Sequence, residues 1–535
     1  MPCPCTRCTA RRVPAFGLPR LPGRGPQPLP FRPYPATAPG GRATARPTTP
    51  TGPTAPTAPH NRVMPPTTND RPSMHQYIGG ALATGTAART AAVVDPSTGE
   101  NVHTVAPAGP EETDAAVAAA TAALGDWSRA GPAERTRVLA RAGALLGERA
   151  EVFARAEARQ TGMPVRLARA GDVPAAVAAA LGAAAARPPG RGEEERHEPA
   201  GVVAVLVPRT RPLRAAADSV FAALAAGCAV VLKPAVAAPL TAVMLARLLT
   251  EAGLPAGGLN VVTGTGPVAG AHLVRHPGVA QVSFTGSPAG AREVAAGAGG
   301  RKRLTLDSGR RGPFVVHRDA DLAVAVPGVV AAALLHGGQD AAAGARAVVH
   351  RSLVADFVDG AAERFAAVRV GPPQDEGTQL GPLASFSRRH RVAALVERAR
   401  RYADVVTGGC APGRSLAAGA YYRPTLVTGA GADSEIVRAA VPGPVLAVLP
   451  FDTDEEAVRL ANAVPEATAA SVWTRDLGRA RRAAGELRAD RVGVNVHPYD
   501  AGPVAPVTFT RVKQVRYGDG GDGHAADPGR LFFAT

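Results

Sequence analysis

Apolar residues recur at helical spacing along two long segments in the first third of the chain. The segments are EETDAAVAAATAALGDW (111–127) and PAERTRVLARAGALLGERAEVFARAEARQTG (132–162). Acidic and capping residues come early in each segment and arginines later, which is the order that the helix dipole favours. Both segments are therefore predicted to be amphipathic helices that pack on a core.

Short apolar runs bounded by turn residues then alternate with further helical segments. Four of these runs are predicted strands: GVVAVLVP (201–208), CAVVLKPA (228–235), LNVVTGTG (259–266) and QVSFTG (281–286). Strands that alternate with helices at this spacing indicate a parallel, doubly wound sheet. A second block of the same kind runs from about residue 312 to residue 498. Ligands bind beyond the carboxyl ends of such strands, where KPA, TGTG and FTGS lie.

Residues 1–73 have a different composition from the rest of the chain. They hold 19 of the 51 prolines in Pro/Thr/Ala repeats, without helical or strand periodicity. Such a segment cannot bury enough apolar surface to fold alone. It fits a disordered tail, an Arg-rich targeting peptide or an upstream stretch read from the wrong start codon. Met74 opens the first ordered sequence, which favours a misassigned start or a dispensable tail.

The net charge of +16 is unevenly distributed. Residues 1–73 carry ten arginines against Asp70, a net of +9, which leaves +7 for the rest of the chain. Those cations are scattered as single arginines without interleaved aromatics, so they indicate a solvated basic surface and no nucleic-acid partner. No stretch approaches the roughly 18 to 20 uncharged apolar residues of a membrane span, and no membrane association is expected.

The five cysteines do not form a disulfide or metal framework. Cys3, Cys5 and Cys8 crowd the first eight residues, but no partner pair follows at ligand distance, so no metal site is expected. Cys228 lies in an apolar run and is predicted to be a buried core thiol. Cys410 lies in a glycine-rich turn and is predicted to be a loop thiol. This cysteine usage fits a reducing cytoplasm.

Several motifs, in this order and spacing, resemble the aldehyde dehydrogenase superfamily over residues 76–535: LAAGCAVVLKPA, VSFTGS, VLPFDTDEEAVRLAN, AASVWTRDLGRA and VNVHP. The resemblance implies an α/β fold with two doubly wound domains, Rossmann-like and catalytic-type, and a small oligomerisation arm. It divides the chain into a tail (1–73), a cofactor-binding domain (74–306, with an arm strand near 194–205), a catalytic-type domain (307–498) and a C-terminal bridging or oligomerisation segment (499–535). It also implies a homo-oligomer, either a dimer or a tetramer.

The resemblance also assigns catalytic positions, and most of them have changed. The family's G-Q-x-C-x-A-G-x-R motif reads GQDAAAGAR (338–346), so Ala341 stands where the family has its cysteine nucleophile. Thr210 stands at the asparagine position that holds the oxyanion, between two arginines. Asp307 stands at the general-base position, one methylene shorter than the family's glutamate, and Arg310 replaces a glycine. Asp340 is a carboxylate beside the vacant position, but its side chain is expected to point elsewhere.

The positions that bind the cofactor in the family match this sequence more closely than the catalytic positions do. Lys233 matches the lysine that holds the adenine ribose, Phe284, Thr285, Gly286 and Ser287 match the FTGS turn, and Gly264 and Gly266 form a glycine-rich turn. The helix after Ser287 would present backbone amides to a phosphate. The two carboxylates that grip the riboses in the family are replaced by Val236 and Ala440. The resemblance therefore implies weakened binding of NAD or NADP, and an apolar residue at 236 would tolerate the 2′-phosphate of NADP.

Three functions fit these residues. The first is a homologue that no longer oxidises aldehydes but keeps the scaffold, as a nucleotide-binding or oligomer-scaffold partner. The second is an NAD(P)-dependent oxidoreductase with residual or altered chemistry in the same cleft. The third is an interaction protein with an empty cleft. The joint change at Ala341, Thr210, Asp307, Arg310 and Ala440 favours the first.

Overall fold

The structure is a computed structural model that describes residues 73–74, 76–85, 90–186, 195–439, 442–465, 467–498 and 505–514. The chain divides into two compact units, residues 1–67 and 68–535, and every described residue belongs to the second unit. The predicted tail therefore lies outside the described residues, apart from Ser73.

The first sheet has seven strands in the order β11-β10-β7-β8-β9-β2-β3, and the first five in this order run parallel. The four predicted strands are confirmed. The strand bounds are β2 Gln76–Ile78, β3 Ala81–Ala83, β7 Val202–Leu206, β8 Ala229–Lys233, β9 Leu259–Val261, β10 Gln281–Gly286 and β11 Arg303–Ser308.

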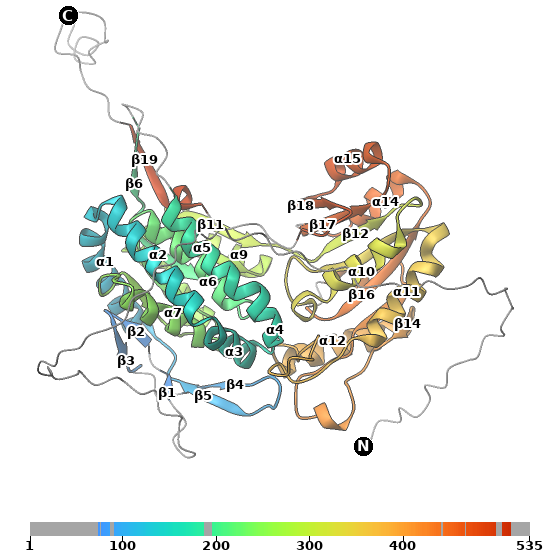
Figure 1. Cartoon of the computed structure of the whole chain (residues 1–535), viewed down its shortest axis with the longest axis horizontal. Coiled ribbons are helices and arrows are strands. Elements are labelled where there is room, and N and C mark those ends of the chain that lie inside the picture. The colour runs from blue at the N-terminus through green and yellow to red at the C-terminus, as the bar shows by residue number, and fades with distance from the viewer. Residues whose placement is uncertain are drawn as a thin grey trace, which may run out of the picture. The chain divides into compact units, whose positions relative to one another are not determined.

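Helices cover both faces of this sheet because alternate strand residues point to opposite sides. In β7, Val203 and Val205 pack in one core cluster, whereas Val202 and Ala204 pack in another. The helices of the first cluster are α2 Pro132–Glu148, α3 Ala150–Thr161, α5 Val173–Ala185, α6 Pro212–Ala225 and α7 Leu240–Glu251 (Figure 1). Those of the second are α1 Pro110–Arg129, α8 Ala271–Arg275 and α9 Pro288–Ala298. The predicted segment 132–162 thus forms two helices, which meet at Arg149.

The second sheet repeats this plan, in the order β14-β15-β16-β13-β12-β17-β18 with only β14 antiparallel to its neighbour. Its strands are β12 Gly312–Val316, β13 Gly344–His350, β14 Asp404–Thr407, β15 Thr425–Thr428, β16 Val445–Phe451, β17 Ala467–Trp473 and β18 Ala489–Val494. One face packs against α10 Leu322–Ala333 and α11 Val354–Ala367. The other packs against α12 Phe386–Ala399, α13 Glu435–Arg438, α14 Asp454–Ala461 and α15 Leu477–Glu486. The predicted α/β class with two doubly wound sheets is confirmed.

Two small sheets complete the described structure. In one, β5 (Asn101–Val105) pairs with β1 (Ser73–Met74) and β4 (Ala91–Val94). In the other, β6 (Glu195–Pro199) and β19 (Thr510–Gln514) form an antiparallel ribbon, which we call the arm (Figure 1). The chain passes from the first large sheet to the second between Ser308, which ends β11, and Gly312, which begins β12.

The segment Val165–Ala185 is long and apolar enough to meet a length and hydropathy criterion for a membrane-spanning helix. It consists of α4 (Val165–Leu167), the turn Ala168–Asp172 and α5. One face of α5 lies in the first core cluster, where the helix packs against α2 and α6. Such packing is typical of a core helix.

Arg311, just before β12, links several segments at the amino-terminal side of the second sheet. Its buried guanidinium donates to the backbone oxygens of Ala333 (3.1 Å), Gly443 (2.9 Å), Val445 (3.3 Å) and Gly344. These oxygens belong to the end of α10 and to the starts of β13 and β16. Burial, together with the nearby charge of Arg346, lowers the pKa of Arg311 to about 9, so the group stays charged at neutral pH.

Replacing Arg311 by Met is expected to lower the free energy of unfolding by about 3 kcal/mol or more, because several buried carbonyls lose their donor. Urea and thermal unfolding followed by circular dichroism measure the loss. Arg318→Met is the control, since Arg318 is exposed on the loop after the same strand and its removal should change stability little. Equal stability of the two variants would contradict the role given to Arg311.

Candidate functional site

The predicted cofactor residues meet at the carboxyl edge of the first sheet. Strand register places Leu206 beside both Lys233 and Phe284, and Thr285 beside Asp307. Because these strands are parallel neighbours, their carboxyl ends share one edge. The fold therefore gathers Lys233, the FTGS turn and Asp307 at one edge.

Lys233 ends β8 with its side chain buried. Its Nζ donates to the backbone oxygens of Gly264 (2.8 Å) and Pro234 (3.0 Å). Burial lowers the pKa of the ammonium to about 8. An ammonium has three N–H donors, and these bonds use two of them. One donor is left for a ligand atom.

Glycines shape the two turns around Lys233. A Cβ on buried Gly264 would lie 2.4 Å from the Cβ of Ala269, so only glycine fits there. Gly266 is exposed, with open space where its Cβ would be. On the other side, a Cβ on Gly286 would lie 2.5 Å from the Phe284 ring, which packs beneath the turn. Ser287 is exposed and caps α9, its Oγ accepting from the amide of Gly290 at 3.2 Å.

Ala341 lies half-buried in the turn before β13, on the amino side of the second sheet. Three left-handed residues precede it: His336 (φ 47°), Gly337 (φ 67°) and Gly338 (φ 66°). A Cβ on Gly338 would lie 2.1 Å from the Gly443 oxygen, so this position also requires glycine. A non-glycine residue such as His336 in this region carries backbone strain, which is commonly found at functional sites.

Arg211 lies between the two parts of the candidate site. Its Nε donates to Asp172 Oδ1 at 3.0 Å and its Nη1 to Asp340 Oδ2 at 3.2 Å, with all three side chains at most 14% exposed. Arg211 itself has a left-handed backbone (φ 52°) and precedes α6. Asp172 belongs to the first core, and Asp340 immediately precedes Ala341. One guanidinium thus joins the turn at Ala341 to the first core.

The Asp340 side chain points toward Arg211. Burial opposes its ionisation, but the Arg211 charge, the His336 ring and the Ala342 amide together hold the pKa of Asp340 below its ordinary value. The Ala342 amide donates to Oδ1 at 2.8 Å. A carboxylate held in this way is a poor base and a poor nucleophile.

Little open space remains beside Thr210. A cavity of about 20 Å³ is lined by residues that include Thr210, Arg211, His336, Gly337 and Gln339. That volume holds about one water molecule. On the other side of Thr210, the Arg209 guanidinium donates to the Gln160 oxygen at 3.3 Å, and burial lowers the pKa of Arg209 to about 10. The two arginines that flank Thr210 thus fill the space around it.

Asp307 is exposed by surface area at the end of β11. The pKa of its carboxyl is nevertheless raised, mainly because surrounding atoms limit hydration of the charged form. The negative charges of Asp340 and Asp490 raise the pKa further, and the positive charge of Arg491 lowers it. Arg310 forms a β-bridge with Ala467, and its oxygen accepts from the Thr468 amide at 3.0 Å. The backbone of Arg310 thus pairs with the start of β17 in the second sheet. Ala440 lies outside the described residues.

Three residues near the site were missed from the sequence. Glu157, fully buried in α3, accepts from the Leu213 amide at 2.6 Å, and burial with the nearby Asp172 charge raises its pKa to about 8. His497 donates from Nε2 to the Ala342 oxygen at 2.7 Å and so supports the turn at Ala341. Asp172 was detectable as the lone acid of an otherwise apolar helical segment.

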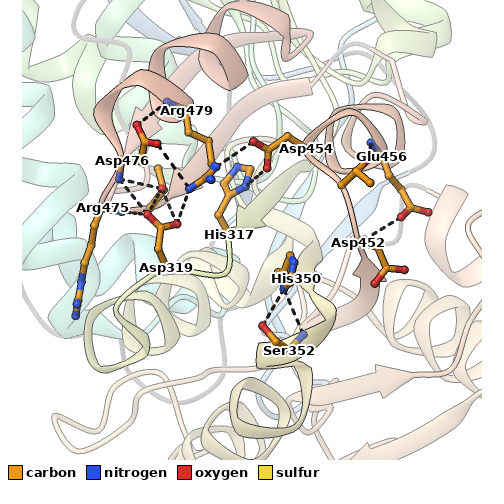
Figure 2. Close-up of polar contacts among 12 residues, drawn as sticks. His317, Asp319, His350, Ser352, Asp452, Asp454, Glu456, Arg475, Asp476 and Arg479 are labelled. Carbon is orange, nitrogen blue, oxygen red and sulfur yellow. Dashed lines mark hydrogen bonds and ion pairs between the residues drawn. The ribbon is translucent and has the colours of Figure 1, made fainter.

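The carboxyl edge of the second sheet carries another polar cluster, shown in Figure 2. Asp454 accepts from His317 Nδ1 at 3.1 Å and from Arg479 Nε at 3.0 Å, and Arg479 Nη1 donates to Asp319 at 3.0 Å. Thr474 also donates to Asp319, at 2.9 Å. These bonds join the ends of β12, β16 and β17 and pair the charges with one another. We therefore assign the cluster a structural role, which is to hold these strand ends together.

The two cysteines outside residues 1–73 lie where the sequence predicted. Cys228 is buried, and its Sγ donates to the Phe509 oxygen at 3.3 Å. Burial raises the pKa of its thiol, which keeps the nucleophilic thiolate scarce. Cys410 is half-buried in the loop after β14. Neither belongs to the turn around Ala341.

Comparison with solved structures gives relatives along most of the chain. An aldehyde dehydrogenase variant from Pseudomonas syringae, with a cysteine replaced by alanine and complexed with NAD+ and octanal, is 34% identical over 83% of this chain and 96% of its own, with a TM-score of 0.78. PnpE, known from Pseudomonas sp. WBC-3, is 32% identical in its complex with nicotinamide adenine dinucleotide, over 83% and 97% of the two chains, with a TM-score of 0.78.

A third relative, the NAD+ complex of an aldehyde dehydrogenase from Bacillus cereus, is 31% identical over 83% of this chain and 96% of its own, with a TM-score of 0.77. The family model for the aldehyde dehydrogenase family matches residues 83–527. That match covers the five parallel strands of the first large sheet, the whole second sheet, the turn at Ala341 and the arm. This chain therefore belongs to the aldehyde dehydrogenase family.

Proposed function

We propose that this chain is an aldehyde dehydrogenase homologue that binds a nicotinamide nucleotide but does not oxidise aldehydes through a covalent intermediate. The observation that carries the proposal is the ion pair of Arg211 with Asp172 and Asp340, which holds a guanidinium next to Thr210 and fixes the residue that precedes Ala341. A missing nucleophile and an obstructed pocket would each prevent aldehyde oxidation.

The chemistry of the methyl group at Ala341 supports the first part of this proposal. In the family, a thiolate attacks the aldehyde and the resulting adduct releases hydride. A methyl group has no lone pair to attack with. Loss of the nucleophile in other covalent enzymes lowers kcat by about a millionfold. Asp340 does not substitute for the thiolate because Arg211 and the Ala342 amide hold its oxygens.

The edge of the first sheet fits the adenosine end of a nicotinamide nucleotide. Lys233 keeps one N–H donor for a ribose hydroxyl, Gly266 leaves open space, and the amide of Ala289, in the first turn of α9, lies beside exposed Ser287. The nucleotide, when bound, supplies a hydride acceptor. The alanine variant from Pseudomonas syringae holds NAD+ and octanal, which supports the view that a missing cysteine is compatible with binding.

The arm supports a homo-oligomer as a further part of the proposal. In the described residues, β6 and β19 form strand pairs only with each other, so each has a second edge that no other described strand covers. Such an edge is suited to pairing with another chain. A cytoplasmic location remains our expectation from cysteine usage.

The nucleotide proposal predicts that NAD+ and NADP+ raise the unfolding temperature and give measurable heats in isothermal titration calorimetry. Lys233→Met should weaken both nucleotides about tenfold, because it removes the donor to the ribose. Val236→Glu should weaken NADP+ more than NAD+, since a carboxylate repels the 2′-phosphate. Exposed Arg247→Met is the control. If neither nucleotide binds the unaltered protein, the cleft is empty and the proposal fails.

The pocket proposal predicts that Ala341→Cys alone does not restore octanal oxidation, followed as NADH absorbance. Alkylation and mass spectrometry would establish that the new thiol is present and reactive. A variant that also carries Thr210→Asn, Arg211→Phe and Asp307→Glu should be at least about tenfold more active than Ala341→Cys, because it reopens the pocket and restores the oxyanion donor. Full turnover by Ala341→Cys alone would show that the ion pair does not close the site.

The ion pair predicts a stability that depends on pH. The pKa of Asp340 is depressed in the folded state, so its contribution is present above its ordinary value of 3.8 and is lost as pH falls through the folded pKa. Arg211→Met should cost about 3–5 kcal/mol at pH 7, because it leaves buried carboxylates unpaired. The cost should shrink toward pH 4, as the unpaired Asp340 becomes protonated.

Urea unfolding at pH 7 and pH 4 measures this difference. Arg351→Met is the matched control, because it breaks an exposed pair with Asp452 and should change stability little at either pH. The double variant Arg211→Met with Asp340→Asn should recover part of the loss at pH 7. A cost for Arg211→Met that is the same at both pH values would rule out the assigned pairing with Asp340.

A further inference from the structure

A basic hollow lies at the amino-terminal ends of β10 and β11, the opposite edge of the first sheet from Lys233 and Ser287. It has a volume of about 560 Å³. We call it the basic hollow because five cationic side chains line it: Arg275, Arg301, Lys302, Arg303 and Arg511. No aspartate or glutamate belongs to its lining.

These cations come from three separate segments of the chain. Arg275 ends α8, residues 301–303 lead into β11, and Arg511 belongs to β19 of the arm. The arm lies beside this end of the sheet, since the Arg303 guanidinium donates to the Thr510 oxygen (Figure 1). Along the sequence, the cations outside residues 1–73 are scattered. The fold instead brings five of them to one hollow.

The positive charge of the basic hollow is largely uncompensated. Arg511 pairs with Glu198 at 3.0 Å, and Lys302 donates to the His276 oxygen. Within the described residues, the guanidinium groups of Arg275 and Arg301 have no hydrogen bond or ion pair. Five cations therefore face one paired carboxylate. Because like charges repel, such a gathering favours the binding of an anion.

The size and chemistry of the hollow define its ligand. A volume of several hundred cubic ångströms is that of a small-molecule site. Guanidinium groups bind phosphate oxygens through paired N–H donors, and several of them together favour a ligand with several negative charges. We propose that the basic hollow binds a small polyphosphate, either inorganic or the phosphate chain of a nucleotide. This site is separate from the nicotinamide nucleotide site at the carboxyl edge.

Isothermal titration calorimetry of the full chain with inorganic triphosphate tests the proposal. Arg275→Ala with Arg301→Ala should weaken binding at least about tenfold. Neither side chain has a partner among the described residues, so the double variant should fold normally. The matched control is Arg247→Ala with Arg481→Ala, which removes the same charge from two exposed positions elsewhere and should change the affinity less than about twofold. Equal affinity of the two double variants would overturn the proposal.

Further measurements distinguish the source of the phosphate and the competing occupants. Lys233→Met should leave triphosphate binding unchanged; a loss there would place the anion in the nucleotide cleft and overturn the proposal. ATP that binds more tightly than triphosphate, with the same loss in the Arg275 and Arg301 variant, would support a nucleotide as the natural ligand. If triphosphate does not bind and sedimentation shows that this variant dissociates an oligomer, the hollow is an interface between copies.

Discussion

The candidate site depends on one buried arginine. Arg211 donates both to Asp172, beside the first core, and to Asp340, beside Ala341. Two carboxylates at this depth cannot both be ionised without a cation near them. Their shared pairing fixes the turn that carries Ala341, places a guanidinium beside Thr210 and leaves space for about one water molecule. The closed pocket follows from the need to neutralise this charge.

The nucleotide edge does not depend on that ion pair. Lys233, the FTGS turn and Asp307 are set by the register of parallel neighbouring strands and by glycines that permit close packing at 264 and 286. The turn at Ala341 is held by Arg211, His497 and the carbonyl contacts of Arg311. Because different contacts support the two halves, one half of the cleft can change its chemistry while the other keeps its shape.

Much of the fold was predictable because it follows from local periodicity. Alternate residues of β7 fill opposite cores, and each predicted strand of the first sheet formed where its apolar run lies. The contacts that define the site were less predictable because they join distant segments. Asp172 meets Arg211 across 39 positions, and His497 reaches Ala342 across 155. Nothing near either residue in the sequence identifies its partner, and the same holds for Arg275 and Arg511 at the basic hollow.

The presence of Arg211 next to Thr210 changes how Ala341 should be understood. An isolated cysteine-to-alanine change leaves a pocket that is intact except for one sulfur atom. An arginine with no partner at this depth would be strongly destabilising, so its presence requires the two carboxylates that neutralise it. Asp340 supplies one of them from the position next to Ala341, so the backbone at Ala341 is linked directly to the ion pair. The Arg211 charge at this site is therefore neutralised by two carboxylates, and the same pairing stabilises the turn at Ala341.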